Sequence, residues 1–128
     1  YLANLTGDKN LSWELYLDAL TSDYADIQGG TTADGIHAGV MAGTVWVALA
    51  SYAGLNIHGE YPVFNPNLPS AWKKISFYFS FLDTDYECEV TPASVRLRAD
   101  NKAGGSLKVG ILDKVFEIET GDWTEFEL

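Results

Sequence analysis

The feature of the sequence that most constrains its fold is a change of hydrophobic period near residue 60. From Leu11 to Ile27 the apolar residues recur at intervals of three and four, which is the spacing of one face of an α-helix. Beyond Tyr61, apolar and polar residues alternate, which is typical of strands that bury one face of a sheet. The pattern therefore predicts an α+β chain in which helices precede a sheet.

The first expected helix runs from Leu11 to Ile27. Asn10 is its predicted N-cap, because an asparagine side chain can accept a hydrogen bond from the free N–H groups of a first turn. The apolar face of this helix is made by residues in 4-3-4-3 spacing: Trp13, Leu17, Leu20, Tyr24 and Ile27.

A second helix is expected to begin near Thr32 or Asp34, and Thr31, Thr32 and Asp34 can all cap it. It ends near Tyr52, because Gly54 can adopt the left-handed conformation that terminates a helix. The predicted helix is so apolar that one neighbouring helix cannot cover it. We therefore expect further helices outside this chain.

The same segment has to be weighed as a membrane span. From residue 35 to residue 59 it carries no Asp, Glu, Lys or Arg, and it is long enough to cross a bilayer. It also contains two histidines and several hydroxyl groups, and its flanks, Asp34 and Glu60, are acidic, with no cation to anchor them. An uncharged helix rich in Gly and Ala also results when other helices surround it. We expect a buried helix and no membrane partner.

The second half of the chain predicts roughly six or seven short strands in an antiparallel sandwich. In the segment from Lys74 to Leu82, for example, isoleucine and phenylalanine occupy every second position. This phenylalanine cluster and Trp72 are expected in the core. The turns are expected where residues that favour turns gather: Asp83-Thr84-Asp85, Thr91-Pro92 and Asp100–Gly105.

Net charge and cysteine content indicate which binding partners and which cellular compartment to expect. With 18 acidic and 8 basic residues the net charge is −10, which repels nucleic acids. Cys88 is the single cysteine and is predicted to be a small core residue, not a nucleophile. No secretion signal opens the chain, so a cytoplasmic location is expected. Because Tyr1 is the first residue and Met41 the single methionine, we expect a part of a longer polypeptide.

One turn can carry chemistry. The run Gly29-Gly30-Thr31-Thr32 leads into a predicted helix, where backbone N–H groups, two hydroxyls and the positive end of the helix dipole suit an anion such as phosphate. His37 is placed on the first turn of that helix and could donate to the same anion. The residues alone leave a second interpretation open, a capped helix with a polar first turn and one satisfied histidine.

The sequence around this turn closely resembles the late segment of glycoside hydrolase family 65 phosphorylases, which act on maltose, trehalose, kojibiose and related α-glucosides. The resemblance is sharp over about residues 20–82 and rests on three stretches: the segment from Asp26 to Thr44, then Tyr52-Ala53-Gly54-Leu55, and then Phe64-Asn65-Pro66-Asn67-Leu68-Pro69 with Trp72. Asp34 departs from the glutamate usual in the family, which leaves fine geometry near the site open. The turn at Asp83-Thr84-Asp85 replaces a commoner Arg-Gly.

The resemblance implies a fold and a division of the chain. Family members have an N-terminal β-sandwich, an (α/α)6 barrel that bears the active site, and a small C-terminal β-sheet domain. On that map residues 1–58 are the last helices of the catalytic barrel, and residues 59–128 are the C-terminal β-sandwich domain.

It also implies a reaction. Phosphate attacks the anomeric carbon of an α-linked glucose disaccharide while a glutamic acid protonates the departing oxygen, and the product is β-glucose 1-phosphate. No residue here matches the context of that glutamic acid, so no catalytic residue is named and the chain alone is expected to be inactive. No metal and no cofactor are implied, since phosphate is a co-substrate. Relatives are commonly dimers, so a homodimer is possible.

The resemblance assigns roles to six residues around the turn. His37 is the expected phosphate contact, and Thr31, Thr32 and Gly35 are expected to line the same pocket. Gln28 and Asp34 either contact phosphate or hold the turn from behind.

Two other functions remain open. Some relatives are hydrolases, which use water in place of phosphate. Alternatively, the chain could be a complete, non-catalytic binding or structural domain, which would require the second helix to find cover within the chain or in an oligomer.

Overall fold

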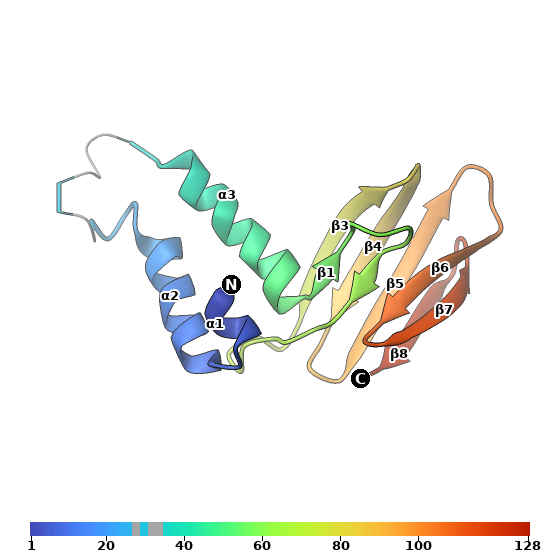
Figure 1. The fold of residues 1–128 in the computed structure, drawn as a ribbon. Coiled ribbons are helices and arrows are strands. Elements are labelled where there is room, and N and C mark those ends of the chain that lie inside the picture. Colours follow the sequence, from blue (N-terminus) through green and yellow to red (C-terminus); the bar gives the residue numbers. More distant parts are fainter. Residues whose placement is uncertain (27–28, 31–34) are drawn as a thin grey trace. The chain divides into compact units, whose positions relative to one another are not determined.

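The computed structural model describes residues 1–26, 29–30 and 35–128 (Figure 1). Its contacts divide the chain into two compact units, Tyr1–Tyr52 and Ala53–Leu128, called here the helical unit and the sheet unit. The sequence-based domain assignment places its boundary between residues 58 and 59. That assignment concerns the domains of a longer protein and stays a prediction.

The helical unit contains α1 (Leu2–Leu5), α2 (Lys9–Thr21), α3 (Ala38–Trp46) and a π-helical turn, η2 (Val47–Tyr52), that continues α3. The predicted N-cap Asn10 is wrong. Asp8 caps α2, and its Oδ1 accepts a hydrogen bond of 3.0 Å from the N–H of Leu11.

α2 is shorter than predicted and stops at Thr21 instead of Ile27. The hydroxyl groups at its end turn back onto the helix: Thr21 Oγ1 donates to the carbonyl of Leu17 at 2.8 Å, and Ser22 Oγ donates to the carbonyl of Ala19 at 2.9 Å. Asp26 then adopts a positive φ of 50°, which no right-handed helix contains. Residue 27 itself lies outside the described residues.

The face of α2 that is buried differs from the predicted apolar face. Leu17, Leu20 and Tyr24 are exposed within this chain, whereas Ser12 and Tyr16 are buried. The buried face packs on Tyr52, whose hydroxyl donates to the carbonyl of Ser12 at 3.1 Å and whose ring meets that of Tyr16 edge-on at 5.3 Å. The aromatic contact and the hydrogen bond satisfy both the apolar ring and its polar end.

The second helix begins at Ala38, later than the predicted start near Thr32 or Asp34. Gly35 has a φ of +102°, which excludes it from a helix, and His37 is the N-cap. Thr31, Thr32 and Asp34 lie outside the described residues. The helix does end at Tyr52, and Gly54 has the predicted left-handed φ, +70°. No helix within the described part of the chain is long and apolar enough to cross a membrane.

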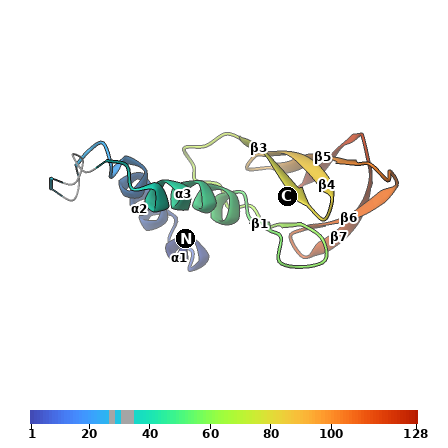
Figure 2. The ribbon, with the colours of Figure 1, turned by 90° about the horizontal axis from the view of Figure 1, so that it is seen from above.

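The sheet unit is a sandwich of two four-stranded sheets, which Figure 2 shows as two layers. The first sheet has the order β1-β2-β6-β7, with these bounds: Leu55–Asn56, Val63–Phe64, Ser106–Ile111 and Lys114–Glu119. The second sheet has the order β3-β4-β5-β8, with these bounds: Ile75–Phe81, Thr84–Val90, Ser94–Asn101 and Trp123–Glu127. The prediction of a small β-sandwich is confirmed.

Two details of the sandwich differ from the sequence prediction. The strands β1 and β2 have only two residues each, too few to show an alternation, and β2 pairs with β6 in parallel, so the first sheet is not purely antiparallel. The first predicted turn is also displaced. Phe81 pairs with Thr84, so the hairpin turns on Leu82 and Asp83, which both have positive φ.

The core lies between the two sheets. Fully buried side chains come from β4 and β5 on one side and from β2 and β6 on the other, among them Cys88, Leu97, Phe64 and Val109. Cys88 is a core residue as predicted, and burial raises the pKa of its thiol to about 12, so it is neutral and unreactive near neutral pH. The phenylalanines of β3 pack against this core as predicted, whereas Trp72 is half-buried and is not one of the core residues.

A substitution at Gly54 tests the close backbone approach that begins the sheet unit. A Cβ atom there would lie 2.0 Å from the carbonyl oxygen of Asn65, and the φ of +70° disfavours any other residue. We expect Gly54→Ala to lower the free energy of unfolding by roughly 3–5 kcal/mol in urea denaturation. Gly59→Ala is the control, because its nearest atom lies at 3.8 Å, and its change should stay within about 1 kcal/mol. Equal losses in the two variants would contradict the assignment.

Candidate functional site

The described part of the predicted site is the chain that approaches α3. Of the predicted phosphate-binding residues, Gly35 and His37 are described, and both are exposed. Thr31 and Thr32, together with Gln28 and Asp34, lie outside the described residues. The geometry therefore concerns His37, Gly35 and the residues that hold them.

His37 is held by Asp23, which follows the end of α2. One carboxylate oxygen, Oδ2, accepts a hydrogen bond of 2.8 Å from the backbone N–H of His37, and the other, Oδ1, lies 2.6 Å from ring atom Nδ1. Bonds to two parts of one residue fix both the start of α3 and the direction of the imidazole ring. With Nδ1 directed to Asp23, the Nε2 atom is the one left to meet a ligand.

This contact changes the acidity of the carboxyl group. The pKa of Asp23 is lowered from its ordinary value, chiefly by the hydrogen bond from the His37 ring. Burial, the second-largest effect, opposes this shift, and the hydrogen bond from the His37 backbone and the charge of the ring lower the pKa further. The Asp23 side chain is 12% exposed and that of His37 is 44% exposed. The carboxylate is thus enclosed while the imidazole faces solvent.

The start of α3 provides donors beside this ring. His37 caps α3 with its carbonyl, which accepts from the N–H groups of Val40 and Met41 at 2.9 and 3.1 Å, but its side chain makes no capping hydrogen bond. The first N–H groups of a helix have no partner within it, and they carry the positive end of the helix dipole. Together with Nε2 of His37 they suit an anion.

A second carboxylate shapes the preceding turn. Oδ1 of Asp26 accepts a hydrogen bond of 2.7 Å from the N–H of Gly30, and its backbone carbonyl accepts one of 3.0 Å from Gly29. Both glycines have positive φ, 71° and 101°, which explains why glycine occupies these positions. Asp26 therefore accepts hydrogen bonds from both glycines, through its side chain and through its backbone carbonyl.

Sequence reasoning missed the roles of Asp23 and Asp26. Asp23 lies 14 residues before His37, and no helical or strand spacing links the two. The sequence prediction placed both residues inside a helix running to Ile27, so neither was considered as a partner of the turn. The one local signal is that Asp26 stands three residues before the Gly29-Gly30 pair, since aspartate and glycine are both common in turns.

The comparisons with known proteins bear on the chain as a whole. The pattern described as "Glycosyl hydrolase family 65, C-terminal domain" matches residues 55–118, which lie within the sheet unit and make up half of the chain. The chain belongs to glycosyl hydrolase family 65. The family resemblance proposed from the sequence is confirmed.

Two relatives and one solved structure show the extent of this similarity. Trehalose 6-phosphate phosphorylase of Lactococcus lactis subsp. lactis is 34% identical over 122 residues, which are 95% of this chain and 15% of that protein. Kojibiose phosphorylase of Caldanaerobacter subterraneus subsp. tengcongensis is 31% identical over 93 residues, 72% of this chain and 12% of that protein. A structure titled putative kojibiose phosphorylase from human microbiome superposes with a TM-score of 0.83 at 20% identity, covering 98% of this chain and 18% of that one.

The small fraction of each relative that this chain covers limits what the family assignment says about function. The chain spans less than a fifth of the length of each of these proteins. The superposition, at 20% identity, shows that the fold of this chain recurs in that protein. The activity of the relatives belongs to polypeptides several times longer than this chain.

The Asp23 carboxylate predicts a pH dependence at the start of α3. Because its pKa is lowered in the folded chain, its contact with His37 is complete above the ordinary aspartate value near 3.9 and is lost as the pH falls through the lowered value. We expect the NMR signal of the His37 amide to show an acid transition below pH ~3.9, absent in Asp23→Asn. Asp18→Asn, an exposed carboxylate on α2, should leave the transition unchanged. A transition that survives in Asp23→Asn would contradict the contact.

Proposed function

We propose that the chain is the C-terminal part of an inverting α-glucoside phosphorylase, and that its turn before α3 binds the phosphate co-substrate. The observation that carries the proposal is the Asp23–His37 contact, which directs the imidazole so that Nε2 remains open at the start of α3. Relatives that are 25–34% identical to this chain carry the names trehalose 6-phosphate phosphorylase, kojibiose phosphorylase and alpha,alpha-trehalose phosphorylase.

In this proposal His37 donates from Nε2 to a phosphate oxygen, and Thr31, Thr32 and Gly35 complete the pocket through hydroxyl and backbone groups. The φ of +102° at Gly35 supports the last of these roles, because only glycine lets the backbone turn so close to the helix start without strain. Gln28 and Asp34 hold the turn. The Asp23 carboxylate would repel phosphate if it faced it directly, so its part is to position the ring.

The chemistry needs little more from this chain. A phosphate oxygen forms a bond to the anomeric carbon as the glycosidic C–O bond breaks, and a glutamic acid outside this chain supplies the proton to the leaving oxygen. Phosphate is already an anionic nucleophile, so positioning and charge-matched donors suffice, whereas an inverting hydrolase needs a second carboxylate to activate water. No cofactor or metal takes part, and this chain alone has no activity.

The helical unit is proposed to contribute the last helices of an (α/α)6 barrel, with residues 1–58 assigned to the barrel and residues 59–128 to the C-terminal domain. Its exposed apolar surface supports this. Large side chains on α2 and α3 are open to solvent within the described chain, including Leu15 at 54%, Val45 at 60% and Trp46 at 51%. Large apolar side chains exposed in such number on two helices are normally covered by further elements. The full-length protein is proposed to be cytoplasmic and to form a homodimer.

The direct test uses the full-length protein, defined here as the longer polypeptide that carries this chain. It is incubated with maltose, trehalose, kojibiose and nigerose, each with and without phosphate, and the sugars released are identified. We expect β-glucose 1-phosphate from one of them, formed only when phosphate is present. Free glucose released at equal rates in both conditions would identify a hydrolase and reject the proposal.

The role of His37 is tested by His37→Ala in the full-length protein. Loss of a charge-assisted hydrogen bond should raise the KM for phosphate by roughly 10- to 100-fold. The KM for the disaccharide should change far less, since the sugar is held elsewhere. His58→Ala is the control, because His58 is exposed and, among the described residues, its ring makes no hydrogen bond, while its backbone N–H donates to Oδ1 of Asn56. An equal effect on both substrates would remove His37 from the phosphate site.

A further inference from the structure

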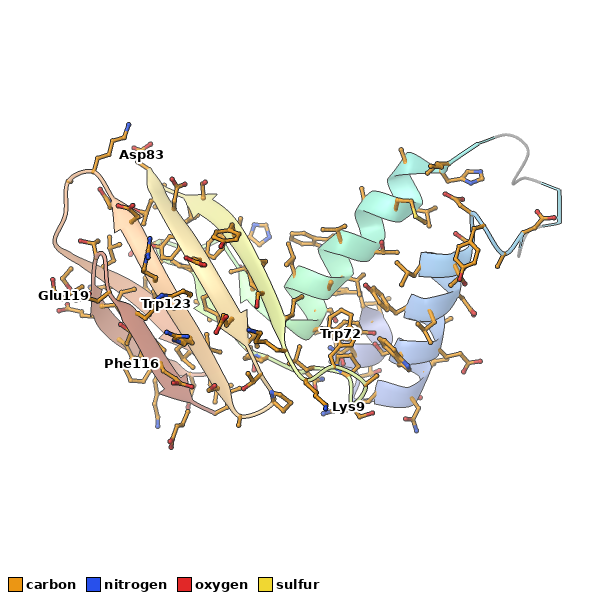
Figure 3. All side chains as sticks on the ribbon, turned by 180° about the vertical axis from the view of Figure 1, so that it is seen from behind. Lys9, Trp72, Asp83, Phe116, Glu119 and Trp123 are labelled. Atoms are coloured by element: carbon orange, nitrogen blue, oxygen red, sulfur yellow. The ribbon has the colours of Figure 1, made fainter. Side chains whose placement is uncertain are left out.

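The outer face of the second sheet carries a row of four residues, one from each strand. Tyr78 on β3 pairs with Glu87 on β4, Glu87 with Arg98 on β5, and Arg98 with Trp123 on β8. Their neighbours along the strands, such as Cys88 and Leu97, are buried in the core, so these four side chains point to the other side. Figure 3 shows Trp123 on the side of this sheet that faces the viewer. We call these residues the outer row.

In the next row along the sheet, which contains Glu89 and Arg96, the charged side chains form ion pairs. Nζ of Lys74 lies 2.9 Å from Oε1 of Glu89, and the guanidinium of Arg96 lies 3.4 Å from Oε2 of the same carboxylate. The Arg96 guanidinium also covers one face of the Trp123 ring, 4.3 Å from its centroid. These contacts account for Glu89 and Arg96 as ordinary cross-strand stabilisation.

The outer row is different because its ion pair is not made. The Glu87 carboxylate accepts a hydrogen bond of 2.6 Å from the hydroxyl of Tyr78, and it makes no ion pair with Arg98, its cross-strand neighbour. Across residues 1–26, 29–30 and 35–128, the Arg98 guanidinium makes no ion pair or hydrogen bond. Its five N–H donors are therefore available, beside a tyrosine ring that is 75% exposed and held in place by its hydroxyl.

A shallow depression of about 370 Å³ lies over this part of the sheet. Its polar lining comes from Tyr78, Ser80, Asp85, Glu87, Arg98 and Asp100. A cation placed here would meet the guanidinium, and an anion would meet three carboxylates. A neutral molecule with several hydroxyl groups satisfies both, since each hydroxyl can accept from Arg98 and donate to a carboxylate.

We propose that the outer row of the sheet unit is a binding surface for a neutral oligosaccharide of α-linked glucose. The exposed face of the Tyr78 ring offers a flat apolar surface to the C–H side of a sugar, and Arg98 with the carboxylates meets its hydroxyl groups. From Tyr78 to Trp123 the row crosses three strand spacings, about 14 Å, which exceeds the length of a single sugar ring. The choice of α-linked glucose rests on the proposed function, whereas the site itself follows from the row.

The test titrates maltotriose into the full 128-residue chain and follows the backbone and indole N–H signals by NMR. We expect shifts confined to the outer row and its depression, including Arg98 and Trp123, and at least tenfold weaker binding of glucose. Arg98→Gln should weaken maltotriose binding roughly tenfold through loss of the charged donors. Tyr78→Ala is a second, independent variant. Lys114→Ala removes an exposed cation from the other sheet and should bind like the original chain.

The signals of Val95 and Leu97, buried beneath the row, report whether each variant is folded. Absence of shifts with maltotriose, shifts outside the outer row, or equal binding by Arg98→Gln and Lys114→Ala would overturn the proposal. The outcome is separable from the phosphorolysis assay. Maltotriose binding at the row without phosphate-dependent cleavage by the full-length protein would reject the proposed function alone, and cleavage without binding at the row would reject this surface alone.

Discussion

The arrangement of the candidate site depends on one interaction, the double hydrogen bond from His37 to the carboxylate of Asp23. It joins the residues after α2 to the first residue before α3, so it fixes where α3 starts and where the imidazole points. A carboxylate with a lowered pKa keeps its charge, and with it the contact, throughout the neutral range. The functional proposal follows from this geometry, because Nδ1 faces the carboxylate and Nε2 remains for a ligand beside the helix N-terminus.

The sheet unit is organised by a different constraint, the alternation of its strands. Inward residues such as Cys88 and Leu97 form a closed apolar core between the two sheets, and a raised thiol pKa is one consequence of that enclosure. Outward residues form charged and aromatic rows whose members are set by the strand register. The same register that makes the core stable therefore decides which polar groups meet at the surface, including Arg98 beside Tyr78 and Glu87.

Secondary structure was predicted best from the sequence where the alternation of apolar and polar residues continues over several residues. The strands from β3 to β8 and the core position of Cys88 follow from alternation alone, and Gly54 follows from the need for a left-handed residue after a helix. Sequence-based prediction failed where a single hydrogen bond determines which residue caps a helix or which residues pair. Asp8 caps α2 in place of Asn10 because of one bond to Leu11, and the two-residue strands β1 and β2 are defined by pairing partners that no local pattern reveals. The Asp23–His37 contact spans 14 residues and is of the same kind.

The central claim is that His37 presents Nε2 to phosphate while Asp23 holds Nδ1. The most direct measurement is a crystal structure of the full-length protein with bound phosphate. The account predicts a phosphate oxygen about 2.7–3.2 Å from Nε2 of His37, with the ring still bonded to Asp23. Phosphate bound away from the start of α3, or a His37 ring turned so that Nε2 points elsewhere, would contradict it.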